Sequence, residues 1–294
     1  MKKQAGDIVL IADSGSTKTD WKLITAEGEE HSFRTIGFNP YFQTAQVVYK
    51  EISLHLVPDL IKLSLSGLYT DKLKIFFYGA GCSSSSKCSV VFDAIRRAFP
   101  NADICIEHDL LAAARALCGK KPGIAAILGT GSNSCLYNGN AIVENVASLG
   151  YILGDEGSGA HIGKLFMQDY LYNDVPENIA ERFAESYQLN RELILDAIYK
   201  QAMPSKFLAS FNKFISDHRD EKYVSDLIRH SFGQFFDKHI CRYTGHKKVP
   251  VNCVGSIGFH YQNILRTVAE ERGIEIGRVM ESPIYALVDF HTND

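Results

Sequence analysis

The chain has 294 residues, a formal net charge of −3, 46% hydrophobic residues and 22% charged residues. This length and composition allow two ordinary globular domains or one large one. A small negative charge without a long basic run argues against nucleic acid or an anionic membrane as the main partner. The seven cysteines form no CxxC pair, which argues against a zinc cage or a disulfide framework. Because residues 1–13 also lack a secretory signal pattern, we expect a cytoplasmic protein.

The first part of the chain alternates strand and helix patterns. Apolar, β-branched or alternating runs predict strands at 8–13, 19–26, 31–36, 72–81 and 102–109. Apolar residues near helical spacing predict helices at 43–56, 89–99 and 110–117. Strands that alternate with helices are typical of an α/β layer with parallel strands.

The strand pattern restarts near residue 123, where 123–129, 132–140 and 141–147 read as three strands. The stretches "IADSGSTKTDWKLITAEGE" and "ILGTGSNSCLYNGNAIVE" share one plan of strand, glycine-serine tip, strand, tight turn and strand. We interpret this as an internal duplication about half the chain apart. Helical patterns then follow at 158–172, 177–188, 190–202, 205–216 and 221–244. The segment 247–273 reads as a strand, a third glycine turn and a helix.

Three glycine tips each follow an apolar strand, at Gly15, at Gly131 and at Gly255 with Gly258. Glycine lets the backbone turn sharply and approach a ligand, and the N–H and hydroxyl groups of such a tip can surround phosphate oxygens. No Walker A loop and no dinucleotide fingerprint is present. The first two tips join strand to strand, so glycine hairpins are expected to hold the phosphates.

At these residues the chain resembles the acetate and sugar kinase/heat-shock-70/actin superfamily. "DSGSTKTDW" is similar to its first phosphate motif, "GTGSNS" to its second and "VGSIG" to its adenosine motif. "GYILGDEGSGAHIG" (150–163) is similar to the signature of the N-acetylglucosamine kinase branch, grouped with the BadF/BadG/BcrA/BcrD ATPase proteins. The resemblance runs from residue 8 to about residue 290.

The resemblance implies an α/β fold of two ribonuclease H-like, actin-like ATPase domains of the duplicated βββαβαβα type, with an interdomain cleft. The implied domains are 1–116, completed by 282–294, and 117–281 with a helical insertion.

The resemblance also implies ATP and Mg²⁺ as ligands, with Asp13 orienting the metal through water. The implied phosphate contacts are Gly15, Ser16, Thr17 and Lys18 from the first tip and Thr130, Gly131 and Ser132 from the second. The residues implied to border the adenosine are Gly255, Ser256 and Gly258. The residues implied to contact the sugar are Asn39, Gly81, Asp109, Gly150 and Asp155.

Several of these residues also have plain structural interpretations. Asp109 matches the position of the general base, which would take a proton from a sugar hydroxyl; the structural alternative is a cap for the helix that follows, and one residue can serve both roles. Glu107 is the weaker candidate for the base. Asp155 could cap a helix that starts near residue 158, and Asn39 could be a turn residue before the next proline. Core packing of the second strand explains Trp21.

The leading hypothesis is an ATP-dependent kinase that phosphorylates an amino sugar, N-acetylglucosamine to the 6-phosphate. Leu149 replaces the tryptophan of the eukaryotic enzymes, so glucosamine or another hexose stays open as the substrate. The alternative is an ATPase activator of the kind that serves CoA-ester reductases, although no cysteine pair has convincing cluster spacing. A nucleotide-binding chaperone or regulator is ranked lowest. The resemblance is also compatible with a homodimer.

Overall fold

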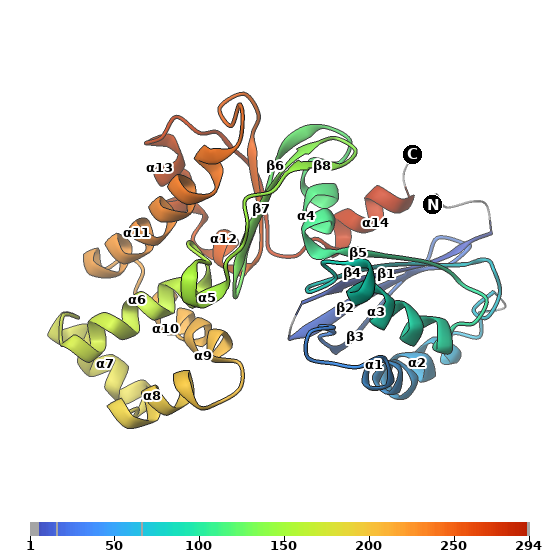
Figure 1. Cartoon of the computed structure of the whole chain (residues 1–294), viewed down its shortest axis with the longest axis horizontal. Coiled ribbons are helices and arrows are strands. Elements are labelled where there is room, and N and C mark those ends of the chain that lie inside the picture. The colour runs from blue at the N-terminus through green and yellow to red at the C-terminus, as the bar shows by residue number, and fades with distance from the viewer. Residues whose placement is uncertain (1–5, 16, 66, 293–294) are drawn as a thin grey trace. The chain divides into compact units, whose positions relative to one another are not determined.

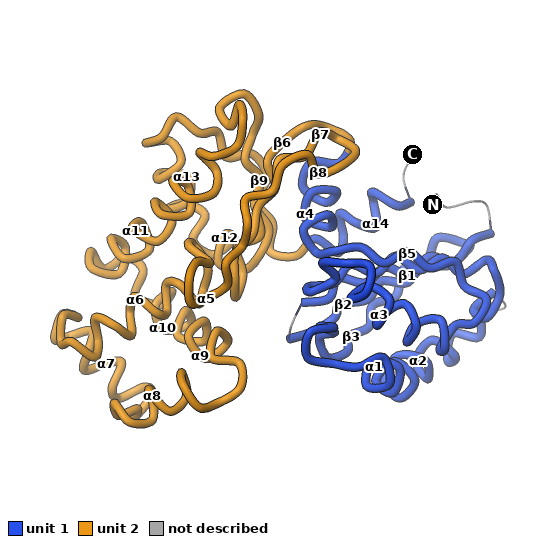
Figure 2. Tube along the Cα trace, viewed as in Figure 1, with its two compact units in different colours: residues 1–119, 283–294 blue, residues 120–282 orange. Residues whose placement is uncertain are grey.

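A computed structural model describes residues 6–15, 17–65 and 67–292. The chain divides into two compact units, which Figure 2 colours separately. Unit 1 is Met1–Gly119 with Pro283–Asp294, and unit 2 is Lys120–Ser282. Each unit contains one five-stranded sheet. Among the described residues, no helix combines the length and the apolar character that crossing a membrane requires.

The sheet of unit 1 has the order β3-β2-β1-β4-β5. Its strands are β1 (Ile8–Ser14), β2 (Lys18–Ile24), β3 (Glu30–Ile36), β4 (Leu73–Gly79) and β5 (Asp103–His108). β1, β4 and β5 run parallel, while β2 and β3 are antiparallel additions at one edge. The central strands β1 and β4 are almost continuously apolar because helices cover both faces of the sheet.

Figure 1 shows α1, α2 and α3 on one face of this sheet and α4 and α14 on the other. The helices are α1 (Ala45–Glu51), α2 (Val57–Lys62), α3 (Ser85–Ala98), α4 (Asp109–Cys118) and α14 (Ile284–Thr292). The helix predicted at 43–56 is interrupted by a π-helical turn, Ile52–Leu56, before α2 begins. Trp21 is fully buried, and its ring lies against Phe38 and Phe77, which confirms its core role.

The sheet of unit 2 repeats that topology with the order β10-β9-β6-β7-β8. Its strands are β6 (Pro122–Leu128), β7 (Ser132–Asn138), β8 (Ile142–Glu144), β9 (Val251–Val254) and β10 (Ile276–Met280). β6, β9 and β10 are parallel, and β7 and β8 are antiparallel, as β2 and β3 are in unit 1. The predicted fold class and its duplication are therefore confirmed, although β10 was not predicted.

A long helical insertion separates β8 from β9. The helices of unit 2 are α5 (Gly150–Leu153), α6 (Gly159–Tyr172), α7 (Glu177–Tyr187), α8 (Arg191–Tyr199), α9 (Pro204–Ser210), α10 (Asn212–Asp217), α11 (Lys222–Lys238), α12 (Ser256–His260) and α13 (Gln262–Glu270), with a 3₁₀ turn at Ile240–Arg242. The single helix predicted at 205–216 is wrong, because α9 and α10 are separate there. The Asn212 side chain donates to the Ala209 carbonyl (3.1 Å) and occupies an acceptor of the last turn of α9. The helix predicted at 221–244 ends at Lys238, with His239 as its C-cap, and the 3₁₀ turn follows.

The contact between α6 and α9 depends on the absence of a side chain at Gly163. A Cβ there would lie 2.0 Å from the Leu208 carbonyl oxygen, which is backbone and cannot give way. We expect Gly163→Ala to lower the free energy of unfolding by about 3 kcal/mol, measured by urea denaturation followed by circular dichroism. In the matched variant Gly233→Ala, the nearest atom is the flexible end of Arg272, at 3.0 Å. A loss as large in Gly233→Ala would contradict this packing argument, since alanine itself favours a helix over glycine by about 1 kcal/mol.

Candidate functional site

Three parallel strands of unit 1 end at the same level. Ser14 of β1 pairs with Gly79 of β4, and Gly79 pairs with His108 of β5. The residues that follow, among them Gly15 and Asp109, therefore lie at one edge of the sheet. The carboxyl ends of parallel strands are where open α/β sheets bind ligands.

Asp109 is the first residue of α4 but does not cap it. The cap is His108, whose Nδ1 accepts the N–H of Leu111 at 3.2 Å. The interpretation of Asp109 as a helix cap is therefore wrong. Burial raises the pKa of the Asp109 carboxyl, while the charge of His108 and the backbone N–H groups of Asp109 and Leu110 oppose the rise. Such a carboxylate holds a proton more readily than an exposed one.

Asp13 is a second carboxylate of perturbed pKa in unit 1. Burial raises its pKa to about 7, the negative charges of Asp109 and Asp20 add to the rise, and Lys18 opposes it. Asp13 and Asp109 are therefore close enough to repel each other when both are ionised. A divalent cation would relieve that repulsion, and the carboxylate oxygen of Asp13 is a ligand type that Mg²⁺ prefers.

Among the described residues, no three or more His, Cys, Asp or Glu side chains gather to hold a metal ion. The Asp13 carboxylate would suit a Mg²⁺ ion in another way, because this ion usually keeps several waters and is bound through one or two carboxylates.

The first tip contains a charged cluster. The Lys18 ammonium and the Arg34 guanidinium each lie 2.7 Å from the Asp20 carboxylate. Although burial raises the pKa of Asp20, the hydrogen bonds from these two cations leave it below its ordinary value. The Gly15 N–H donates to the Lys18 carbonyl at 3.0 Å, and Thr17 is exposed. The predicted phosphate ligand Ser16 lies outside the described residues.

The structure brings Asn39 and Gly81 together. A Cβ at Gly81, which has a φ of +81°, would lie 2.5 Å from the Asn39 Oδ1. That same oxygen accepts the Tyr41 N–H at 3.0 Å, so Asn39 also orders the turn in which it lies. Two residues predicted to contact a sugar from separate loops are therefore neighbours.

The second tip, Gly129–Gly131, is held by the first turn of α6. The N–H of Gly159 donates to the Gly129 carbonyl (2.8 Å), and the N–H of Ala160 donates to the Thr130 carbonyl (3.0 Å). The Ser132 hydroxyl beside this tip is buried and has no partner among the described residues. A buried hydroxyl without a partner is uncommon in native proteins and indicates a place where a ligand atom fits.

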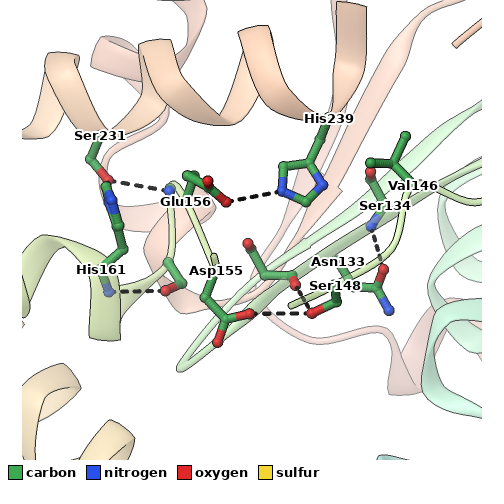
Figure 3. Close-up of polar contacts among 12 residues, drawn as sticks. Asn133, Ser134, Val146, Ser148, Asp155, Glu156, His161, Ser231 and His239 are labelled. Atoms are coloured by element: carbon green, nitrogen blue, oxygen red, sulfur yellow. Dashed lines mark hydrogen bonds and ion pairs between the residues drawn. The ribbon is translucent and has the colours of Figure 1, made fainter. Parts of the chain in front are cut away.

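Asp155 lies against this second tip, and Figure 3 shows its carboxylate directed toward Ser148. Its carboxylate accepts the Ser148 hydroxyl at 3.2 Å and the backbone N–H of Ser132. A Cβ at Gly131 would lie 2.9 Å from its Oδ2, so a larger residue there would displace the carboxylate from the tip. Burial raises the pKa of Asp155, and these two hydrogen bonds oppose the rise. The interpretation of Asp155 as a helix cap is wrong, because Ser158 caps α6.

A pocket of about 370 Å³ opens beside the second tip in unit 2. It is lined by Gly129, Thr130, Gly159, Ala209, Asn212, Lys213, Ser216, Asp217, Ser256, Ile257, His260 and Tyr261. Of the residues predicted to border the adenosine, Ser256 lines the pocket. Gly258 packs instead against Leu128, and a Cβ at Gly255, where φ is +119°, would lie 2.4 Å from the Leu128 carbonyl oxygen.

No motif in the sequence marks the part of the pocket wall that α10 supplies. Asn212, Lys213, Ser216 and Asp217 belong to the helical insertion, which has no glycine motif. Gly150, predicted to contact the sugar, begins the short helix α5 with a φ of +73°. Leu149, just before it, is exposed.

Two sheets of one topology, each with a strand–tip–strand hairpin of glycine and hydroxyl residues, define the actin-like ATPase fold. The chain is 40% identical to a protein from Porphyromonas gingivalis described as a "putative N-acetylglucosamine kinase". The alignment covers 97% of this chain and 99% of that protein, with a TM-score of 0.90. The chain belongs to the family of this protein, within the actin-like ATPase superfamily.

More distant structures share the fold. A protein of the same description from Chromobacterium violaceum is 15% identical, with a TM-score of 0.78 over 98% of this chain and 99% of its own. A ROK family glucokinase from Streptomyces griseus, solved with glucose and AMPPNP, is 14% identical, with a TM-score of 0.53 over 97% of this chain and 98% of its own. No protein-family model and no curated protein matches the chain, so the grouping with the BadF/BadG/BcrA/BcrD ATPase proteins stays a prediction.

Proposed function

We propose that this protein is an ATP-dependent sugar kinase that transfers the γ-phosphoryl group of ATP to the 6-hydroxyl of N-acetylglucosamine. The observation that carries the proposal is the carboxylate of Asp109, which is not the cap of its helix and whose pKa burial raises. The description of the Porphyromonas gingivalis relative supports the choice of sugar.

ATP is expected to bind with its adenosine in the pocket of unit 2. The pocket has the volume expected of a small-molecule site, and Ser256 and Tyr261 line it. Gly129 and Thr130 of the second tip form part of its wall. The phosphates of an ATP whose adenosine lies in the pocket would therefore extend toward this tip and the Ser132 hydroxyl. The first tip, with Lys18, would provide the remaining phosphate contacts.

Asp13 would hold Mg²⁺ through water. The metal supplies charge neutralisation on the phosphates, and Asp13 supplies the carboxylate that keeps it in place. The raised pKa of Asp13 supports this assignment, because a carboxylate crowded by burial and a second carboxylate gains most from a nearby cation.

Asp109 would act as the general base. As the sugar oxygen forms its bond to the γ-phosphorus, the O–H bond breaks and the proton passes to the Asp109 carboxylate, while ADP leaves with the electrons of the broken P–O bond. The raised pKa of Asp109 supports the role, since a carboxylate with a raised pKa accepts a proton more readily near neutral pH. Asn39, Gly81, Gly150 and Asp155 would contact the sugar hydroxyls.

A coupled ADP-release assay with ATP·Mg²⁺ and a panel of sugars tests this proposal. We expect N-acetylglucosamine to give the highest kcat/KM. A higher kcat/KM for glucosamine or glucose would change the assigned substrate but would leave the kinase assignment intact. ADP release that no sugar accelerates would refute the kinase assignment and would favour an ATPase activator of the CoA-ester reductase type.

Filling the pocket should block the nucleotide. Ala209 lines the pocket on α9, and we expect Ala209→Phe to raise the dissociation constant of ATP at least about tenfold, which corresponds to 1.4 kcal/mol. The matched control is Ser210→Phe, which places the same ring on the next, exposed residue. Titration with a fluorescent ATP analogue measures both. Equal affinities in the two variants would show that the nucleotide binds elsewhere.

A further inference from the structure

The loop that carries Asp155 is anchored to α11, on the opposite side from the second tip. Figure 3 shows Asp155 directed toward Ser148 while Glu156, the next residue, is directed toward His239. The Glu156 Oε2 lies 3.2 Å from the His239 Nε2. The N–H of Gly157 donates to the Ser231 hydroxyl, also at 3.2 Å. Asp155 therefore binds at the second tip, while the next two residues of the loop, Glu156 and Gly157, bind α11 and its C-cap.

The anchor points on α11 form one stripe. Ser231, Phe235 and His239 are spaced four residues apart, so their side chains share one face of the helix. The His239 ring is 3% exposed and stacks on Phe235, with 5.3 Å between ring centroids. A Cβ at Gly157 would lie 2.8 Å from the Phe235 Cβ. The loop backbone thus rests directly on the helix, in a contact that only glycine allows.

Ser231 uses both hydrogen-bonding capacities of its hydroxyl in this anchor. Burial lowers the pKa of His161 to about 4, so its imidazole is neutral near pH 7. The Ser231 Oγ accepts the Gly157 N–H and can donate to the His161 Nδ1 at 2.8 Å. His161 belongs to the first turn of α6, whose N–H groups hold the second tip. α11, the loop and the tip are therefore one connected polar network.

Asp155 needs such support because its backbone is strained. Its φ is +56°, a left-handed conformation that is unfavourable for a non-glycine residue and persists where the surroundings impose it. Among the described residues, Ser148 and Ser132 donate hydrogen bonds to the carboxylate on its own side of the loop.

We propose that Glu156, His239 and Ser231 are positioning residues that fix the Asp155 carboxylate at the second tip, and that they determine sugar affinity without touching the sugar. The assignment of sugar affinity rests on the proposed function. The Glu156–His239 pair is largely buried, so removal of one partner would leave the polar group of the other without this contact.

Hydrogen exchange tests the anchor without any activity. In Glu156→Ala, we expect amides in a peptide that covers 154–158 to exchange at least about tenfold faster than in the wild type, with the rest of unit 2 unchanged. The matched control is Glu271→Ala, which removes the exposed partner of Arg229 on the same helix and should leave the loop protected. Unchanged exchange in Glu156→Ala, or faster exchange throughout unit 2, would overturn the proposal. Ser231→Ala, which removes only a hydroxyl, provides the same test if Glu156→Ala does not fold.

Steady-state kinetics test the consequence for the sugar. We expect Glu156→Ala to raise the KM for the sugar at least about tenfold, with the dissociation constant of ATP within about twofold of the wild-type value. Glu156→Gln keeps an acceptor oxygen for His239 and should recover most of the loss. An unchanged sugar KM, or an equal loss of ATP and sugar affinity, would refute the positioning role. If no sugar is phosphorylated by the wild type, the proposed function fails, and the exchange data alone decide whether the anchor exists.

Discussion

Replacement of Asp109 by asparagine is expected to lower kcat by about 10²–10⁴-fold, the range that general acid–base catalysis contributes. Asparagine has nearly the same shape but cannot take the proton of the attacking hydroxyl. Because His108 caps α4, the substitution removes no helix cap, and we expect the protein to stay folded. Single-turnover measurements with saturating sugar would separate this chemical step from binding and product release.

ATP affinity provides the control for this variant. The pocket is lined by residues of unit 2, so Asp109→Asn should leave the dissociation constant of ATP within about threefold of the wild-type value. Glu107→Gln tests the other candidate base, and we expect it to retain most of the turnover. Turnover retained in Asp109→Asn and lost in Glu107→Gln would move the base to Glu107.

Asp13→Asn is expected to lower the Mg²⁺-dependent kcat/KM by about 10²-fold or more, because the variant loses the carboxylate that holds the metal. Titration of activity with Mg²⁺ should show a weaker response at every sugar concentration. An unchanged Mg²⁺ titration would remove Asp13 from the metal site.

The same substitution should stabilise the protein in the absence of ligands. The pKa of Asp13 is raised to about 7 in the folded chain from an ordinary value of 3.8, so the folded state binds more protons than the unfolded state between these pH values. Its contribution to stability is therefore fully present below about pH 4 and is lost as the pH rises through about 7.

Asparagine cannot ionise and removes this loss. We expect Asp13→Asn to exceed the wild type in free energy of unfolding by up to about 4 kcal/mol at pH 8, since the pKa rises by about three units and each unit corresponds to about 1.4 kcal/mol. The two proteins should converge near pH 4. Urea denaturation at several pH values in EDTA measures the difference, and parallel curves for the two proteins would contradict the raised pKa.

The sequence was sufficient to predict the duplicated fold because its signals are local. Buried parallel strands are continuously apolar, as in β1 and β6, and glycine with hydroxyl residues marks each tip. Asp109 could be placed at a strand end for the same reason. Asp13 was assigned to the metal by resemblance alone. Its repulsion by Asp109 depends on β1 and β5 lying in the same sheet, on either side of β4, which the structure shows.

Contacts between residues far apart in the chain could not be predicted, because no motif in the sequence marks them. The wall of the pocket on α10 and the anchor of the Asp155 loop on α11 depend on how a helical insertion folds back onto β6 and α6. Residues as far apart in the chain as Glu156 and His239 meet there, and neither stands in a motif that would pair them. The residues considered as caps of α4 and α6 were Asp109 and Asp155, whereas the caps are His108 and Ser158. All four residues lie near a helix start and can accept an N–H there, so the sequence does not distinguish them.

Direct detection of the product tests the central claim. The protein is incubated with ATP·Mg²⁺ and N-acetylglucosamine, and the products are identified by ³¹P NMR and mass spectrometry. We predict a phosphate monoester on the 6-oxygen of the sugar, formed in equal amount with ADP by the wild type and at least about 100-fold more slowly with Asp109→Asn. ADP without a phosphorylated sugar, or equal product from both proteins, would contradict the account.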